Sequence, residues 1–354
     1  MTLPVSYRLE PGERVAVTGA AGFIGSAVTR ELLERGTQVV ALVEPDGDTR
    51  NLDGLEVEQV EVDLRDADGL AKAVDGARTV FHLAALYRFW AADPQSFYDV
   101  NVVGTRNLIK AAEAAGVGRV VYTSTVGTLG LRGASAGAPV DETSYAQVDH
   151  LFGLYKQSKY VAEHEVLRAA AQGLPVVLVQ PTTPVGPGDR GPTPTGRTVL
   201  EFLNGRFPAY VDTTLNIVDV DDVAHGHLLA AERGSIGRSY ILGGENLSLQ
   251  QILALLAEAT GLSAPTRRVP NSLAVLAATV SDVVEGRLLH REPSIPLEAA
   301  KMSTTQMSFD DSRARGELGY HSRPAGEALA RAAHWFAEAG YVRNDRLDQF
   351  RWRT

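Results

Sequence analysis

Tyr155 and Lys159 are two residues whose types and spacing could do chemistry together. They lie four positions apart in a stretch that predicts a helix, so they share one face of it. A phenol with an unperturbed pKa of about 10 is a poor acid or base at neutral pH. A cation held beside it favours the phenolate and moves that pKa toward the working pH. The other reading of such a pair is an ordinary exposed helix face, so the surrounding elements have to decide.

A glycine-rich turn near the N-terminus indicates a phosphate-binding site. An apolar strand expected at Val15–Val17 is followed by Gly19, Gly22 and Gly25, and a helical pattern continues from Ser26 to Arg35. Strand, glycine turn and helix in this order present free backbone N–H groups and a positive dipole end to a phosphate. The glycines suit a tight turn, close approach to a pyrophosphate and close packing of helix against strand. A glycine triplet alone is equally compatible with a structural turn in another α/β protein.

Two acidic residues extend this pattern. The expected strand Gln38–Val43 ends at Glu44, where a carboxylate would reach the adenosine ribose hydroxyls of a dinucleotide. The expected strand Val57–Val62 is followed by Asp63, at a position that often holds the adenine. The other reading of Asp63 is a helix N-cap, a role that Asp66 could fill instead.

Further strands are expected at Thr79–Ala85 and Arg119–Thr125, and helices separate the strands along the chain. This alternation predicts a parallel sheet with helices on both faces. Ligands of such sheets lie beyond the carboxyl ends of the strands. Five candidate residues therefore converge on one edge of the sheet: Gly19, Glu44, Asp63, Ala84 and Thr125.

The regular alternation stops after a sixth strand expected at Leu174–Gln180, because proline and glycine crowd residues 181–196. We therefore expect an α/β protein with a doubly wound parallel sheet, a Rossmann fold. Its dinucleotide-binding domain would occupy residues 1–185, with returns near 215–243. A smaller irregular lobe that binds the substrate would lie mainly in residues 186–354.

Three segments carry expectations of their own. Residues 130–143 are rich in glycine and alanine, which favours a surface loop over the site. The amphipathic stretch Leu273–Leu289 favours a lid or lobe-packing helix over a membrane-surface helix, because its charges are mixed. The polar tail 344–354 is expected to be loose.

The composition excludes several classes of function. A net charge of −9 argues against sequence-independent binding to nucleic acid and against binding to an anionic membrane. The chain has no cysteine, hence no thiolate nucleophile or thiolate metal site, and His225 and His227 face different directions on a helix, so we expect no metal. No signal-peptide pattern precedes the first strand, so a cytoplasmic location is the expectation.

Six short stretches together resemble the extended short-chain dehydrogenase/reductases, also called the NAD-dependent epimerase/dehydratase family. The glycine spacing is Gly-x-x-Gly-x-x-Gly, as in that superfamily, and the resemblance covers nearly the whole chain. The stretches are Thr18–Gly25, Asp63–Leu64, His82–Ala85, Asn101–Asn107, Tyr122–Val126 and Tyr155–Lys159.

Within that family the sequence is similar to the dihydroflavonol-reductase-like branch, which includes bacterial members labelled hopanoid-associated sugar epimerases. Four further stretches carry this similarity: Leu86–Trp90, Pro192–Gly196, Ala209–Asp212 and Tyr240–Asn246.

The resemblance implies a role for each catalytic residue. Tyr155 would be the general acid/base, and Lys159 would bind the nicotinamide ribose and tune Tyr155. Thr125 would hydrogen-bond the reacting oxygen at a position where many relatives carry serine, with Ser124 as the second candidate. Hydride would pass between the nicotinamide and a carbonyl or alcohol carbon. The alternative is a sugar epimerase or dehydratase that uses tightly bound NAD.

The same resemblance extends the set of candidate binding residues. The cofactor-binding candidates are Gly19, Gly22, Phe23, Ile24, Gly25, Glu44, Asp63, Leu64, Leu83, Ala84, Ala85, Tyr155, Lys159, Pro181, Thr182 and Thr183. The substrate-binding candidates are Tyr87, Thr125, Gly127, Tyr155 and Thr195.

Two departures from the family pattern bear on specificity. Glu44 stands where reductases of the branch usually carry an arginine that pairs with the 2′-phosphate of NADP, so NAD is expected to be preferred; Arg50 nearby could soften this. Leu215 stands where nucleotide-sugar epimerases usually carry an arginine, which lowers the odds of a diphosphate-sugar substrate. The aromatic residues Tyr87, Phe89 and Trp90 suggest a less polar small molecule or, equally, lobe packing. By analogy with relatives, two long helices would pair in a homodimer.

Overall fold

Seven strands form one parallel sheet, in the order β3-β2-β1-β4-β5-β6-β9. The computed structural model describes residues 7–88, 90–130, 138–144, 146–148, 151–289, 291, 293, 297–304 and 306–352. The central strands are runs of buried, mostly apolar residues, as expected of a parallel sheet covered on both faces. The strands are β1 (Arg14–Thr18), β2 (Gln38–Val43), β3 (Glu58–Glu61), β4 (Thr79–His82), β5 (Arg119–Thr123), β6 (Val176–Pro181) and β9 (Ser239–Leu242).

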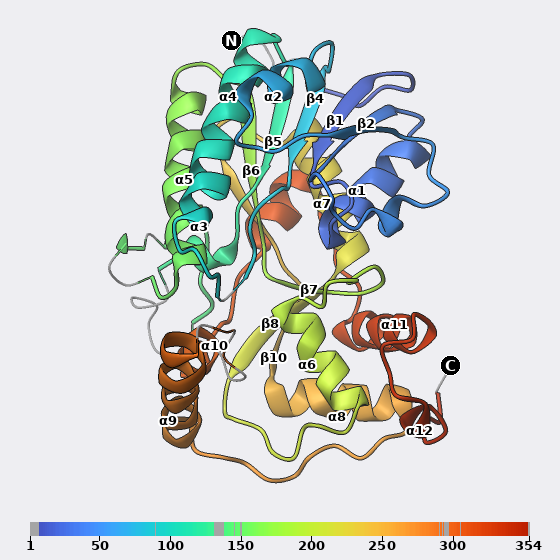
Figure 1. The fold of residues 1–354 in the computed structure, drawn as a ribbon. Coiled ribbons are helices and arrows are strands. Elements are labelled where there is room, and N and C mark those ends of the chain that lie inside the picture. The colour runs from blue at the N-terminus through green and yellow to red at the C-terminus, as the bar shows by residue number, and fades with distance from the viewer. Residues whose placement is uncertain are drawn as a thin grey trace.

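Helices cover both faces of this sheet (Figure 1). Successive side chains of a strand point to opposite faces, so Val15 and Val17 pack in one apolar cluster and Ala16 packs in the other. The first cluster includes α1 (Phe23–Glu34) and α7 (Val220–Arg233). The second includes α2 (Ala67–Ala73), α4 (Gly104–Ala114) and α5 (Leu154–Ala171). Short elements join them: η1 (Arg50–Leu52), α3 (Ser96–Tyr98), η2 (Asp99–Val103) and η3 (Val126–Thr128).

A second lobe is built on a three-stranded sheet and has its own apolar cluster (Figure 1). Its strands are β7 (Thr183–Val185), β8 (Thr214–Asp219) and β10 (Glu245–Ser248); β8 pairs parallel with β7 and antiparallel with β10. Its helices are α6 (Pro194–Leu203), α8 (Leu249–Thr260), α11 (Ala325–Glu338) and α12 (Asn344–Leu347). The chain also forms α9 (Asn271–Ser281), η5 (Asp282–Leu288), α10 (Leu297–Met302) and η6 (Ala314–Leu318).

The expected doubly wound parallel sheet is confirmed, and three local expectations need correction. The tail is not loose: Phe350 is buried and the Trp352 ring stacks on His334 at 3.7 Å between centroids. Two aromatic anchors outweigh the polar composition of the segment. The sequence also predicts a short strand at Ala209–Val211, but the structure has none there, and Tyr210 makes only an isolated bridge to Arg268. The division at residues 185 and 186 stays a prediction.

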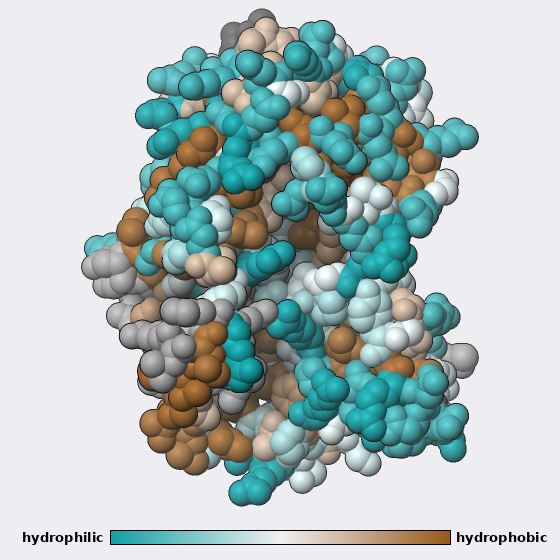
Figure 2. All heavy atoms as spheres, in the orientation of Figure 1, coloured by the Kyte–Doolittle hydropathy of each residue, from teal (hydrophilic) through white to brown (hydrophobic). Residues whose placement is uncertain are grey.

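The third correction concerns α9 and η5, whose apolar stripe is not packed against a lobe. Leu273, Leu276 and Val280 are each more than half exposed, and Figure 2 shows apolar side chains gathered over this helix at the lower left. Half of the loop 130–143 that was expected to cover the site, residues 131–137, lies outside the described residues. Within the described chain, none of the helices has the length and apolar character needed to cross a membrane.

Candidate active site

The glycine turn has the geometry of a tight, closely packed nucleotide-binding turn. Gly19 has a φ of +66°, and a Cβ there would lie 2.9 Å from the backbone of Ala84. A Cβ on Gly25 would lie 2.8 Å from the carbonyl carbon of Gly19 and closer still to its oxygen. Gly22 begins α1 with no side-chain cap on the helix. The turn therefore needs glycine at these positions and leaves a helix N-terminus for an anion.

A buried polar network holds the ends of β1 and β4 next to this turn. The Thr18 hydroxyl lies 2.8 Å from His82 Nδ1 and accepts hydrogen bonds from the backbone N–H groups of Leu83 and Ala84. His82 Nε2 lies 3.0 Å from the hydroxyl of Thr105. Burial lowers the pKa of His82 to about 3, so the imidazole is neutral and its role is structural. The network fixes the backbone of residues 83–85 at the carboxyl edge.

The two acidic candidates lie at the ends of β2 and β3, as expected. Glu44 is exposed just after β2. Asp63 is bound by Arg65, whose Nε donates to Oδ1 at 2.9 Å, and this hydrogen bonding lowers the pKa of Asp63. Asp66, not Asp63, caps α2 by accepting from the N–H of Gly69. The N-cap reading of Asp63 is thereby removed, which leaves its carboxylate at the sheet edge.

Leu64 packs in the interior beneath the carboxyl edge of the sheet and is not exposed at that edge. Its side chain is buried in the cluster with α4, where a Cβ on Gly104 would lie 2.6 Å from Leu64 Cβ. Asn107 Nδ2 donates to the Leu64 carbonyl oxygen at 3.1 Å and so holds the loop after β3. Sequence reasoning quoted Asn107 within a motif but gave it no role.

Tyr155 and Lys159 lie on the first turns of α5, facing the end of β5. The Tyr155 phenol is hydrogen-bonded to Thr125, and its ring lies 4.7 Å from that of Tyr87 between centroids. Lys159 Nζ donates to the Thr123 carbonyl oxygen at 2.8 Å. The structure therefore brings together the residues predicted to do the chemistry.

The electrostatics of the phenol differ from expectation. Burial raises the pKa of Tyr155 above its usual value. The electrostatic interaction with Tyr87 raises this pKa further, and the hydrogen bond with Thr125 lowers it. Burial also lowers the pKa of Lys159 to about 7, against the attraction of Glu163. A cation beside the phenol was expected to lower its pKa, but burial is the largest effect on this phenol and raises the pKa. Tyr155 is therefore a protonated phenol at neutral pH in this structure.

Ser124, the second candidate for the oxygen-binding hydroxyl, is engaged elsewhere. Its hydroxyl donates to the buried Glu163 carboxylate, which also accepts from Thr128 at 2.9 Å and from Gln180 at 3.3 Å. The hydroxyl of Thr125 is hydrogen-bonded to Tyr155, whereas that of Ser124 is directed to Glu163. The geometry favours Thr125 for this role.

The other candidates divide between the edge and the second lobe. Gly127 donates its N–H to Thr125 Oγ1 at 3.1 Å and so stays beside the phenol. Pro181 is the last residue of β6 and Thr182 follows it, and the hydroxyl of Thr183 is buried without a hydrogen-bond partner among the described residues. Thr195 lies in the first turn of α6 and makes no described contact with the other candidates. Phe89 lies outside the described residues.

Three residues near Tyr155 were missed by sequence reasoning. Asn101 accepts from the Leu86 N–H at 2.7 Å and donates to Ser158 at 2.9 Å, which ties the segment carrying Tyr87 to α5. Lys156 and Glu298 are both buried near the phenol. Lys156 could have been suspected from its place beside Tyr155, whereas Glu298 comes from a distant helix with no recognisable motif.

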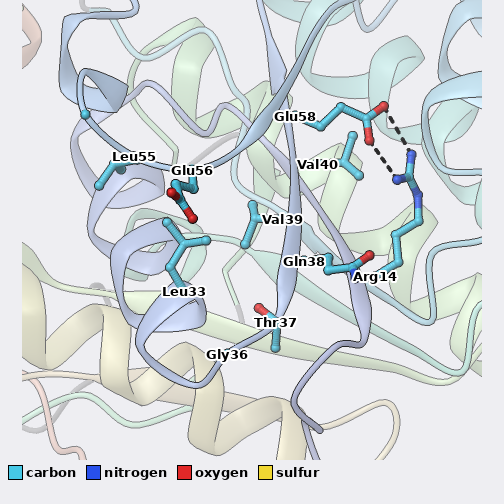
Figure 3. A pocket seen from close by; sticks show the side chains of 11 residues that line it. Arg14, Leu33, Gly36, Thr37, Gln38, Val39, Val40, Leu55, Glu56 and Glu58 are labelled. Atoms are coloured by element: carbon cyan, nitrogen blue, oxygen red, sulfur yellow. Dashed lines mark hydrogen bonds and ion pairs between the residues drawn. The ribbon is translucent and has the colours of Figure 1, made fainter.

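A surface pocket elsewhere on the molecule does not belong to this site. It lies at the opposite, amino end of β2, between the end of α1 and β3 (Figure 3). Arg14 and Glu58 form an ion pair at its rim with a shortest distance of 2.7 Å. Its lining includes none of the candidate residues.

The described residues fit a dinucleotide. The glycine cradle at the start of α1 would close if any of its glycines carried a side chain, Glu44 stands at the ribose end, and Thr183 has an unused hydroxyl. No group of three or more acidic or histidine side chains suited to a metal is found in the part of the chain that the structure describes.

Comparison with known proteins identifies the family of the chain. Residues 15–243 match the model of the NAD dependent epimerase/dehydratase family. The chain is 47% identical over 345 residues to a putative dihydroflavonol 4-reductase of Synechocystis sp., covering 96% of this chain and 99% of that protein. It is 37% identical over 327 residues to sterol demethylase protein B of Methylococcus capsulatus, covering 92% of this chain and 99% of that protein. The crystal structure of gox2253 aligns with a TM-score of 0.83 at 45% identity, covering 94% of this chain and 100% of that one. The chain therefore belongs to the NAD-dependent epimerase/dehydratase family.

Proposed function

We propose that this protein is an NAD(P)-dependent oxidoreductase that interconverts a carbonyl and an alcohol by hydride transfer. The observation that carries the proposal is the phenol of Tyr155, which is hydrogen-bonded to Thr125 on the same sheet edge as the glycine turn. The name of the 47% identical relative, a putative reductase, supports it.

The residues divide the work of the reaction. When bound, the nicotinamide dinucleotide supplies the hydride that reaches the carbonyl carbon. Thr125 and Tyr155 donate hydrogen bonds to the substrate oxygen, and Tyr155 then gives that oxygen its proton. The raised pKa of Tyr155 keeps the phenol protonated at neutral pH, so the proton that the substrate oxygen needs is in place. Alcohol oxidation uses the same groups in reverse, with Tyr155 as the base.

Lys159 positions and charges this centre. Its Nζ donates to the Thr123 carbonyl oxygen, which holds the ammonium at the end of β5 and leaves its other N–H donors for the nicotinamide ribose. With a pKa of about 7, the group carries its charge in only part of the molecules at neutral pH. A bound anion nearby would favour the charged form.

The proposal includes a preference for NAD over NADP. Glu44 is exposed at the end of β2, where it would accept from the ribose hydroxyls and repel a 2′-phosphate. The positive charge of Arg50, which lies nearby in the sequence, could offset this repulsion. Its Nε donates to Asp48 Oδ1 at 2.8 Å, so its charge is already paired. We keep the prediction of NAD as the preferred cofactor.

The alternative is an epimerase or dehydratase that returns the hydride to the same substrate. The description of the matching family favours it. Leu215, on β8, pairs with Leu247 in the small sheet and cannot grip a diphosphate, which weighs against a nucleotide-sugar substrate.

One purification separates the two functions. We expect the purified protein to bind added NADH reversibly and to consume it with a panel of aldehydes and ketones. An epimerase would instead carry NAD through purification and would not consume external NADH with any member of the panel. In either case light scattering would test the predicted homodimer, which we place by analogy at α4 and α5.

A further inference from the structure

Three side chains spaced four positions apart on α5 bind the successive residues 123–125, at and just after the end of β5. The hydrogen-bonded pairs are Tyr155 with Thr125, Lys159 with Thr123 and Glu163 with Ser124. Positions four apart share one face of a helix. Glu163 therefore extends the catalytic face of α5 by one turn beyond Lys159.

Glu163 is a buried carboxylate among hydrogen-bond donors. The residue is 9% exposed and accepts a hydrogen bond from the Ser124 hydroxyl. Its Oε2 also lies 2.9 Å from the hydroxyl of Thr128 and 3.3 Å from Nε2 of Gln180. All three groups can donate, which suits an ionised carboxylate because that form can only accept. A buried charge is stable only when an opposite charge or several hydrogen bonds compensate it.

The ammonium of Lys159 is the opposite charge on this face of α5. Lys159 is 3% exposed, and its Nζ lies 4.4 Å from the centroid of the Tyr122 ring. Burial lowers the pKa of Lys159 to about 7, and among the described residues only the charge of Glu163 acts to raise it. Two buried groups of opposite charge therefore lie one helical turn apart and are bound to the same strand end.

Four other titratable side chains lie near Lys159, on both faces of the sheet. They are His82 on β4, Tyr122 on β5, Tyr155 on α5 and His227 on α7, which is bonded to the Thr123 hydroxyl. Burial lowers the pKa of the two histidines to about 3 and about 4 and raises the pKa of the two phenols. All four groups are therefore uncharged at neutral pH, which leaves Glu163 as the charge that Lys159 senses.

We propose that Glu163 is the buried counter-charge of Lys159 and thereby a positioning residue of the active site. Its carboxylate, anchored by the hydroxyls of Ser124 and Thr128, favours the ammonium form of Lys159 that binds the nicotinamide ribose. Ser124 thus has its function in this anchor and not at the substrate oxygen. The role at the ribose rests on the proposed oxidoreductase function, whereas the pairing of the two charges does not.

The simpler role for Glu163 is to tie α5 to β5 through hydrogen bonds alone. A neutral side chain would then lower the stability of the protein, but Lys159 would gain and lose its proton over the same pH range. A counter-charge instead raises the pKa of its cation. The titration of Lys159 therefore distinguishes the two roles.

This titration can be followed by NMR in the cofactor-free enzyme. The chain contains only five lysines, and labelling their Cε carbons with carbon-13 makes the protonation of each Nζ visible. The signal that is missing from Lys159→Arg assigns Lys159. We expect its midpoint to be about one pH unit or more lower in Glu163→Gln than in wild type. Glu163→Asp keeps the charge and should restore most of the wild-type midpoint.

Glu165→Gln is the matched control for the loss of charge. Glu165 lies on the same helix, two positions from Glu163, but its carboxylate pairs with Arg106 and Arg168 at the surface. This variant should leave the midpoint of Lys159 unchanged. Glu163→Met supplies a second neutral and unbranched side chain, so the comparison does not depend on the folding of Glu163→Gln.

NADH binding provides a second measurement, by quenching of protein fluorescence over the same pH range. The affinity should fall as Lys159 loses its proton, and therefore at a lower pH in Glu163→Gln than in wild type. The same pH dependence in the two proteins would overturn the proposed role of the ammonium form.

The NMR titration separates failure of this inference from failure of the proposed function. An unchanged Lys159 midpoint in both neutral variants would make Glu163 a purely structural residue and overturn the proposal. An equal fall in Glu165→Gln would also overturn it, because the effect would then belong to the total charge of the helix. A lower midpoint in Glu163→Gln, with no NADH binding by wild type at any pH, would uphold the counter-charge and refute the oxidoreductase.

Discussion

Replacing Gly25 by alanine tests whether the glycine turn is a binding surface shaped by close packing. The added methyl group would lie 2.8 Å from the Gly19 carbonyl carbon, closer to its oxygen, and 3.1 Å from Ala20 Cα. All three atoms are backbone, so no side chain can rotate away and the turn itself must move. Overpacking of this kind costs about 1–3 kcal/mol of stability.

The displacement should weaken dinucleotide binding as well as the fold. A turn shifted by part of an ångström or more moves the N–H groups at the start of α1 away from the pyrophosphate. Loss of about 1.4 kcal/mol of binding energy corresponds to tenfold in Kd. We therefore expect Gly25→Ala to bind NADH at least about tenfold more weakly, measured by quenching of protein fluorescence.

Gly316→Ala is the matched control for this experiment. Gly316 lies in the helical segment η6, and a Cβ there meets nothing within 4 Å. Alanine should therefore leave NADH affinity unchanged and raise the free energy of unfolding by about 0.5–1 kcal/mol. If Gly25→Ala bound NADH as tightly as Gly316→Ala and wild type, the reasoning about the turn would be refuted.

Two further predictions follow from charges at the site. Glu44→Arg should shift the ratio of kcat/KM from NADH toward NADPH by tenfold or more, and an unchanged ratio would remove Glu44 from cofactor selection. In the folded protein the pKa of Glu298 is raised from 4.5 to about 7. The folded state therefore holds this proton more tightly than the unfolded state. The free energy of unfolding falls as the pH rises through this range. Among the groups facing it, Lys156 reduces this cost, whereas Tyr87 and Tyr155 are neutral at these pH values. Glu298→Gln should therefore gain up to about 3 kcal/mol over wild type in urea unfolding at pH 8 and much less at pH 5, and an equal difference at both pH values would contradict this.

The sheet and the strand-end residues could be predicted because local patterns determine them. Apolar runs alternate with helical periodicity, and parallel order then places Gly19, Glu44, Asp63 and Thr125 on one edge without knowledge of any contact. Which of two neighbouring hydroxyls meets Tyr155 is visible only in the structure, where Ser124 donates to Glu163 and Thr125 is bonded to Tyr155.

The remaining features depend on contacts between distant segments. The tail packs because Phe350 is buried in the apolar cluster of the second lobe, and the sequence of the tail itself does not predict this contact. The pKa of Tyr155 depends on burial, which a pair spacing does not reveal. Glu298 reaches the start of α5 from a distant helix, and its own sequence does not reveal that contact.

Hydride transfer itself can be followed with NADH carrying deuterium at C4 of the nicotinamide. The account predicts that wild type places this deuterium on the carbinol carbon of the product alcohol, detected by mass spectrometry. Tyr155→Phe should bind NADH normally but transfer deuterium about 10²–10⁴-fold more slowly, the usual contribution of a general acid. Deuterium transfer at the wild-type rate by Tyr155→Phe, or an alcohol product without deuterium, would contradict the central claim that Tyr155 supplies the proton as hydride arrives.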